Sequence, residues 1–380
     1  MKVIANRAEL LALCKRAAKL VNNASPLEEL RGFLLEADAD TGMISVSATN
    51  MEVSLRSQMQ VDVRESGSLI LNAKIGVGML AMLPGDLIAL YAQANSTLLL
   101  AGGQAKYHIA VLPGRSYPPI ELPFPTDTVQ VSGVPSMARR TVFAASSDDS
   151  RVTMQCVNLT FSEDGLKAVS SDGSRIMSAK GDVKGAGAIS MLIPARSLAL
   201  LAGMCTEEDV FSVGSTGKSI VFMMDNFIFS ARRMEGEYVN TDALFNSCQP
   251  MFTILTDGEE LYKAVDSVTA LGEVDGTVVS LCFEKNAIAL SCSGENGTAN
   301  GKLDVIPLSG TPNGTYHYAA HKLKECLRAM GGTMQLKVGQ NGLLLLNSEQ
   351  VSCLNLARRA PSAASVKQAK PSGKTKPKAA

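Results

Sequence analysis

The chain has 380 residues, of which 46% are hydrophobic and 19% are charged, and its 36 Lys and Arg residues balance 36 Asp and Glu residues. This composition is typical of a globular protein with roughly two to three domains. The chain has no run of about 18 apolar residues that could span a membrane, and its N-terminal residues lack the apolar core of a signal peptide. We therefore expect a cytoplasmic protein with no membrane partner.

The first part of the chain alternates predicted helices and strands. A helix is predicted at Arg7–Ala18, where Leu residues recur at helical spacing behind a possible Asn6 cap. A second helix is predicted at Lys74–Leu83, which ends at a Pro-Gly-Asp turn. Strands are predicted at Leu30–Ala37, Met43–Ala48, Glu52–Val63, Ser68–Asn72, Leu87–Ala92, Ser96–Ala101 and Ala105–Val111. The Pro-rich connector LPGRSYPPIELPFP follows and predicts the first domain boundary.

The same order of elements then recurs twice. A meander of three strands is predicted at Val157–Lys180, where apolar residues alternate on both sides of a Glu-Asp-Gly turn. Further helices are predicted at Pro135–Ala145, Arg196–Met204, Gly258–Val268 and His321–Met330, with strands between them up to Leu356. The helix starts lie roughly 61 to 67 residues apart, a period longer than that of solenoid repeats. The chain therefore contains six copies of one helix-plus-strands unit.

This repeat predicts the fold class. One copy buries too little apolar surface to be stable alone, whereas two copies can join their sheets and pair their helices. We therefore expect an α+β protein of three similar tandem domains, at 1–126, 127–249 and 250–359, followed by a tail at 360–380. The tail has five Lys and no acidic residue, and its Pro, Ala and Ser content predicts disorder. A solvated end is favoured over a nucleic-acid-binding arm.

Motifs for catalysis are weak. Only three His residues are present, and His108 lies in a strand pattern that favours a surface residue over a general base. The segment Gly214–Ser219 resembles the end of a phosphate-binding loop, but Ser212 stands where the first Gly is needed and a strand follows, so we predict a hairpin turn. The eight Cys residues form no CxxC pair, which favours buried reduced thiols over a metal site or disulfides. We expect no catalytic residue, cofactor or metal.

The predicted helices are rich in basic residues. They carry few acidic residues, such as Glu9, Glu259, Glu260 and Glu325. Basic residues that recur on the helices of each copy indicate a surface that faces a polyanion. Lys and Arg are, however, also good solvated helix formers. The basic positions are Arg7, Lys15, Arg16, Lys19, Lys74, Arg139, Arg140, Arg196, Lys263, Lys322, Lys324 and Arg328.

Several short segments, in their order and spacing, resemble one family. The segments are Ala48–Glu52, Leu112-Pro113 with Tyr117-Pro118, Phe143-Ala144 with Asp149 and Arg151, Ser171–Ile176, Ile193-Pro194, Met234–Tyr238, Leu303–Val305 and Leu354–Leu356. Through them the chain resembles, over Met1–Arg359, the bacterial DNA polymerase III beta subunit, the DNA sliding clamp.

The resemblance implies a ring. Members of the family are head-to-tail homodimers in which each chain forms half of a ring, and helices line a hole that holds double-stranded DNA without reading its sequence. Ala24 stands where relatives often carry a basic residue. For the dimer interface the resemblance implies Tyr107 and Leu271, beside an acid-poor segment at Ser291–Lys302. For the DNA-facing surface it implies Lys74, Arg139, Arg140, Arg196, Lys263 and Lys324.

The resemblance also implies a peptide groove between the second and third domains, where DNA polymerase, the clamp loader and repair proteins insert short linear motifs similar to Gln-Leu-x-Leu-Phe. Four positions depart from the family pattern, because Ser174 replaces the usual His, Val239 the usual Pro and Thr241 the usual Tyr, and Arg358 stands near a usual Met. Without the resemblance, Ile176, Leu354 and Leu356 are typical of sheet core. The implied groove residues are Met154, Leu159, Ser171, Gly173, Arg175, Ile176, Val239, Leu244, Leu354 and Leu356.

The sequence thus predicts a non-catalytic DNA sliding clamp, a processivity factor that tethers polymerase and other partners to DNA. Two other hypotheses remain open. A DNA-modifying enzyme would need clustered carboxylates or histidines, which the sequence does not offer. A clamp-like scaffold that binds protein partners without closing on DNA is compatible with the altered groove and the acid-poor interface.

Overall fold

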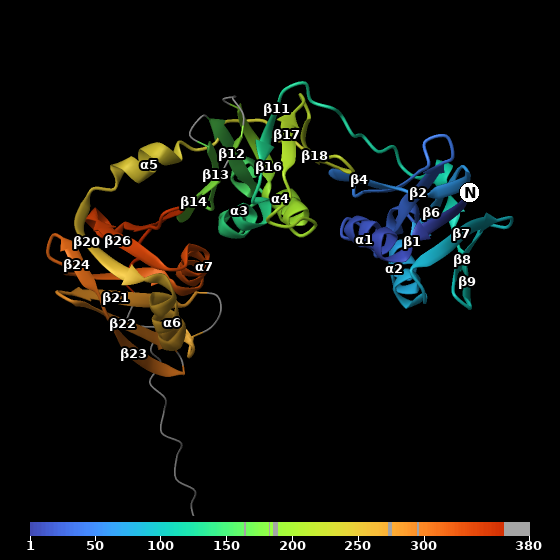
Figure 1. Ribbon diagram of the computed structural model, residues 1–380. Helices are drawn as coiled ribbons and strands as arrows, with labels where there is room; N and C mark the ends of the chain where they lie inside the picture. Colours follow the sequence, from blue (N-terminus) through green and yellow to red (C-terminus); the bar gives the residue numbers. More distant parts are fainter. Residues whose placement is uncertain (163–164, 182, 185–188, 273–275, 295, 361–380) are drawn as a thin grey trace, which may run out of the picture. The chain divides into compact units, whose positions relative to one another are not determined.

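The computed structural model describes residues 1–162, 165–181, 183–184, 189–272, 276–294 and 296–360 (Figure 1). It divides into two units: unit 1 comprises Met1–Ser170 and Lys180–Tyr238, and unit 2 comprises Ser171–Ala179 and the chain from Val239 onward. The predicted bounds of three domains remain a prediction. The basic tail from residue 361 onward lies outside the described residues.

The helices of unit 1 begin within one residue of the predicted starts. In α1, the side chain of Asn6 accepts hydrogen bonds from the backbone N–H groups of Ala8 and Glu9 at 2.9 and 3.2 Å, as the sequence predicts. Helix α1 packs against α2, and α3 packs against α4. The bounds are α1 (Arg7–Ala18), α2 (Ala73–Met82), α3 (Val134–Thr141) and α4 (Ala195–Ala202).

Unit 1 contains a five-stranded antiparallel sheet in the order β5-β1-β7-β8-β9. The predicted single strand at Glu52–Val63 is wrong, because the chain leaves one sheet after Gln60 and β5 pairs with β1, with Val63 opposite Val3. The strands are β5 (Asp62–Glu65), β1 (Lys2–Asn6), β7 (Leu87–Gln93), β8 (Thr97–Gly102) and β9 (Ala105–Ala110).

A ten-stranded sheet joins the two halves of unit 1. Its central pair is β4 with β19, where Leu55 lies opposite Phe229. The hairpin between β17 and β18 confirms the turn predicted at Gly214–Ser219. The order is β10 (Leu112–Pro113), β6 (Gly67–Asn72), β2 (Gly32–Asp38), β3 (Met43–Thr49), β4 (Val53–Gln60), β19 (Phe227–Arg232), β18 (Ser219–Met224), β17 (Phe211–Ser215), β11 (Thr128–Val131) and β15 (Val183–Lys184).

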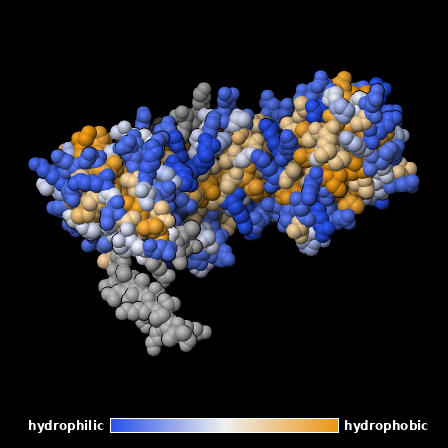
Figure 2. Space-filling view, turned by 90° about the horizontal axis from the view of Figure 1, so that it is seen from below, coloured by the Kyte–Doolittle hydropathy of each residue, from blue (hydrophilic) through white to orange (hydrophobic). Residues whose placement is uncertain are grey.

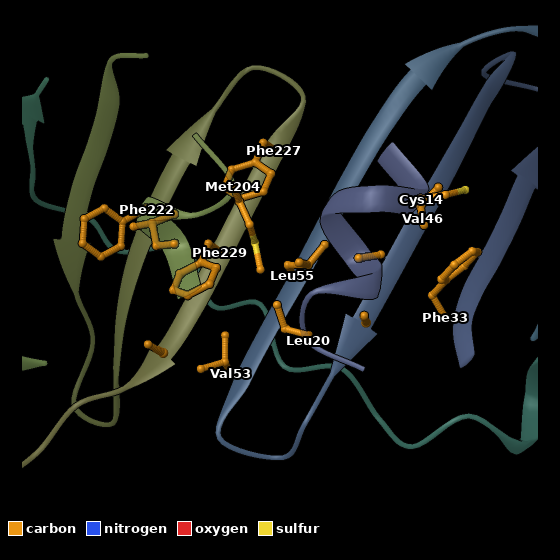
Figure 3. Packing of buried hydrophobic residues seen from close by; sticks show 14 of the residues in the cluster. Cys14, Leu20, Phe33, Val46, Val53, Leu55, Met204, Phe222, Phe227 and Phe229 are labelled. Carbon is orange, nitrogen blue, oxygen red and sulfur yellow. The ribbon is translucent and has the colours of Figure 1, made fainter. Parts of the chain in front are cut away.

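One apolar core runs through both halves of unit 1. Leu20, Val53 and Leu55 from the N-terminal half belong to the same buried cluster as Met204 and Phe229, all less than 7% exposed (Figure 3). The predicted meander begins with β12 (Cys156–Ser162) and β13 (Gly165–Ser171), and β16 (Ile189–Pro194) pairs with β12. Because this buried apolar cluster includes residues of both halves, the two halves of unit 1 pack as one body.

In unit 2, α6 (Gly258–Thr269) and α7 (Ala320–Met330) pack together, as the sequence predicts. The short helix α5 (Thr241–Ser247), capped by Asn240, was not predicted. One set of strands runs in the order β14 (Arg175–Gly181), β28 (Val351–Asn355), β27 (Leu344–Asn347), β26 (Thr333–Gly339), β20 (Pro250–Asp257) and β24 (Ile306–Ser309). A four-stranded sheet has the order β23 (Gly297–Asp304), β22 (Ala287–Gly294), β21 (Val278–Glu284) and β25 (Thr315–Ala319).

The predicted α+β class, with helix pairs beside antiparallel sheets, is confirmed. Six of the eight cysteines are buried and two are half-buried, in agreement with the sequence-based expectation. Within the described residues, none of the helices has the length and apolar character needed to cross a bilayer.

Candidate functional site

The basic residues that are predicted to face DNA all lie on helices that pack in pairs. Lys74 is on α2, Arg139 and Arg140 are in the last turn of α3, and Arg196 is in the first turn of α4. In unit 2, Lys263 is on α6 and Lys324 is on α7. The face shown in Figure 2 carries strongly hydrophilic side chains between apolar patches. Helix pairs that present cations can contact the phosphates of a duplex without reading bases.

Carboxylates lie beside Arg139, Arg196, Lys263 and Lys324. Arg196 Nη2 lies 2.6 Å from Glu52 Oε1, and Lys324 Nζ lies 3.0 Å from Asp266 Oδ1. Arg139 Nη2 donates to Glu207 Oε1. The fourth pair is the looser one between Lys263 and Glu259, at 3.9 Å. The sequence reasoning counted acids along each basic helix and missed Glu207 and Glu52, which lie outside the helices.

Glu207 is also tied to the start of α3. Its Oε2 accepts a hydrogen bond from the backbone N–H of Ser136 at 3.2 Å. Burial acts to raise the pKa of Glu207, but the hydrogen bonds from Arg139 and Ser136 outweigh it, so the pKa is lowered. The residue therefore stays ionised beside Arg139 at neutral pH.

A charge cluster in unit 2 surrounds the predicted groove residue Arg175, whose side chain is only 5% exposed, whereas that of Glu325 is 43% exposed. Its guanidinium donates to Asp172 Oδ2 at 3.1 Å, Glu325 Oε2 at 2.7 Å and the carbonyl of Lys322 at 3.1 Å. The ammonium of Lys322 lies 3.0 Å from Asp172 Oδ2. These contacts attach the turn before β14 to helix α7.

Asp172 also organises the turn itself. Its Oδ1 accepts from the backbone N–H of Ser174 at 2.9 Å and from that of Arg175 at 3.1 Å. Gly173 has φ of 83°, a left-handed conformation that favours glycine. Burial acts to raise the pKa of Asp172, but hydrogen bonds from Ser174 and Lys322 and the charge of Arg175 outweigh it and lower the pKa.

The remaining predicted groove residues of unit 2 differ in exposure. Ile176 and Leu354 lie opposite each other in β14 and β28 and are buried, whereas Leu356 is 51% exposed and its N–H donates to the carbonyl of Ser174 at 3.0 Å. Val239 and Leu244 are 37% and 41% exposed. Ser171 is buried and donates to the carbonyl of Arg175. In unit 1, Leu159 is buried in β12 and Met154 is half-buried.

The predicted dimer-interface residues lie at or near sheet edges. Tyr107 is half-buried in β9, the last strand of the five-stranded sheet in unit 1. Leu271 follows α6 in unit 2, is 43% exposed, and its carbonyl accepts from Asn296 Nδ2 at 3.3 Å. Strand β23 forms an edge of the four-stranded sheet in unit 2. Edge strands have unpaired backbone groups that another chain can pair with.

Comparison with known proteins identifies the family. Residues 1–122 match the N-terminal domain of the DNA polymerase III beta subunit, and residues 128–240 match its central domain. The beta sliding clamp of Synechococcus elongatus is 22% identical over 357 residues, which cover 90% of this chain and 93% of that protein.

Two solved structures have the same fold. The sliding clamp of Bacillus subtilis has a TM-score of 0.86 at 21% identity, covering 95% of this chain and all of that one. A sliding clamp from Bartonella birtlesii bound to griselimycin has a TM-score of 0.83 at 17% identity, with the same coverage. The chain therefore belongs to the DNA polymerase III beta subunit family, the sliding clamps.

Proposed function

We propose that this protein is a DNA sliding clamp that encircles duplex DNA as a homodimeric ring and tethers the replicative polymerase and other partners to it. The observation that carries the proposal is the placement of the bases Lys74, Arg139, Arg196 and Lys324 on paired helices in a chain of this family. A ring holds DNA topologically, so its phosphate contacts can be weak and independent of sequence. The protein acts without catalysis or cofactor, in the cytoplasm.

The proposed ring needs a head-to-tail dimer, in which the contact surfaces of one chain differ from each other and closure gives a ring. Strand β9 with Tyr107 and the region of Leu271 are the surfaces proposed for this contact. Both have apolar side chains at or beside a sheet edge. With few acids in the neighbouring segment, apolar packing supplies most of the contact.

The substitution Leu271→Asp is expected to convert the dimer to monomers, because it places a charge in the proposed apolar contact. Light scattering over a dilution series measures the mass. The control is Leu308→Asp, since Leu308 is a similarly exposed leucine of unit 2, at 49% against 43%. A dimer that persists in Leu271→Asp to the lowest concentration would exclude this contact.

The proposed docking surface for partner motifs includes the exposed Val239, Leu244 and Leu356 and the turn at Ser171–Arg175. Apolar side chains beside backbone groups suit an extended peptide with aliphatic or aromatic anchors. The fixed turn supports the proposal, because a preorganised surface loses less entropy when a peptide binds. A related clamp has been solved with a bound ligand, griselimycin.

The substitution Leu356→Asp is expected to weaken the binding of a labelled peptide with a Gln-Leu-x-Leu-Phe motif by about tenfold or more, as for the loss of one interface anchor of about 1.4 kcal/mol. Fluorescence anisotropy measures the affinity. Leu87→Asp serves as the control, because Leu87 is 66% exposed and lies in unit 1, outside the proposed surface. Equal affinity of the Leu356→Asp variant and the unchanged protein would refute the assignment of Leu356.

A further inference from the structure

Three of the ion pairs on the basic helices join residues far apart in the chain. Glu207 lies 68 residues from Arg139, Glu52 lies 144 residues from Arg196, and Asp266 lies 58 residues from Lys324. Glu207 lies after α4, Glu52 lies before β4, and Asp266 lies on α6 beside α7. The fold therefore brings an acid to each of these basic residues from another element of the chain.

Two of these pairs leave the cation exposed, and the third leaves it partly exposed. The side chains of Arg139 and Arg196 are 66% and 71% exposed, so an approaching phosphate can reach either guanidinium, whereas the side chain of Lys324 is 27% exposed. Glu207 is itself held by the backbone of Ser136, and Arg139 also donates to Ser136 Oγ at 3.1 Å. Exposed ion pairs contribute little net stability. Stabilisation of the fold therefore does not explain why three such pairs lie on helices that would face DNA.

We infer that Glu207, Glu52 and Asp266 lower the affinity of the clamp for duplex DNA. They do so by pairing with the basic side chains that would otherwise bind phosphates. This inference rests on the proposed function. A phosphate must displace the carboxylate from Arg139, Arg196 or Lys324 before it can pair with the base. In each such exchange the phosphate releases a counterion while the freed carboxylate takes one up, so the net release of ions is smaller and the binding depends less on salt.

Low affinity suits a protein that a ring already keeps on DNA. Each strong phosphate contact would have to break at every step along the duplex. A basic side chain that has a carboxylate partner in its own chain returns to that partner when the phosphate moves away. These three acids are positioning residues for the DNA-facing bases. They allow a basic surface to attract DNA without binding tightly at one place.

The variants Glu207→Gln, Glu52→Gln and Asp266→Asn test the inference, because a gain of binding does not result from misfolding. Equilibrium binding to a short, labelled, blunt-ended duplex is measured by anisotropy between 50 and 200 mM salt. Each variant is expected to bind more tightly at 50 mM salt, and its plot of log K against log salt is expected to steepen by about 0.9. This corresponds to about a threefold larger loss of affinity over that salt range.

Two controls separate the release of a base from the simple loss of a negative charge. The double variant Glu207→Gln with Arg139→Gln should not show the tighter DNA binding, because the guanidinium that Glu207→Gln releases is absent. Glu36→Gln frees Arg56, whose Nη2 lies 3.7 Å from Glu36 Oε2 on the ten-stranded sheet, and should change nothing. An equal gain in the double variant, or no gain in any of the three single variants, would overturn the inference. Retention of the unchanged protein on closed circular DNA tests the proposed function independently.

Discussion

Replacement of Arg175 by Ala is expected to lower the free energy of unfolding of unit 2 by about 3–5 kcal/mol, the usual cost when one partner of a buried ion pair is removed. Arg175 holds Asp172 and Glu325 together and also bonds the carbonyl of Lys322. Without the guanidinium, Lys322 is the cationic partner that remains to Asp172 among the described residues, in a site where the Asp172 side chain is 11% exposed. The turn before β14 and helix α7 should therefore separate more easily.

Urea unfolding followed by circular dichroism measures the loss, and hydrogen exchange of the Val351–Asn355 segment shows whether it arises beside Arg175, since β14 pairs with β28. The control is Arg64→Ala. Arg64 lies 3.3 Å from Asp62, but both side chains are more than half exposed, so we expect a loss below about 1 kcal/mol. If the two substitutions cost the same, the charge cluster around Arg175 does not stabilise unit 2.

The elements with the clearest local signals could be predicted from sequence. The helix at Arg7 combines a regular Leu spacing with an Asn6 cap, and the structure has both. The helix at Thr241 was missed because it is only seven residues long, too short for a periodic pattern. The division of Glu52–Val63 was missed because β5 pairs with the N-terminal strand β1, a long-range choice that no local pattern records.

The candidate site was predictable only in part. The resemblance to the clamp family picked out Arg175 and Ile176, but it could not show that both are buried and that Leu356 is exposed. The pairs of Arg139 with Glu207 and Arg196 with Glu52 depend on tertiary structure, because their partners are distant in the chain. Counting charges along a helix therefore overestimates the net charge that the helix presents to a ligand.

Retention of the protein on DNA is expected to depend on whether the DNA is circular or linear. If the chain closes as a ring, retention depends on the topology of the DNA and not on affinity, and the carboxylates beside Arg139, Arg196 and Lys324 keep that affinity low. Linearisation of the DNA should therefore abolish retention almost completely, whereas salt should affect a loaded ring only weakly. The scaffold hypothesis predicts no dependence on DNA ends.

The direct test is retention on nicked circular DNA after loading with a clamp loader and ATP, measured by gel filtration before and after the circle is cut at one site. The account predicts that the protein stays with the circle, leaves after linearisation, and remains when both ends are blocked by bound protein. Equal retention on circular and cut DNA, or no loader-dependent retention on the circle, would contradict the account.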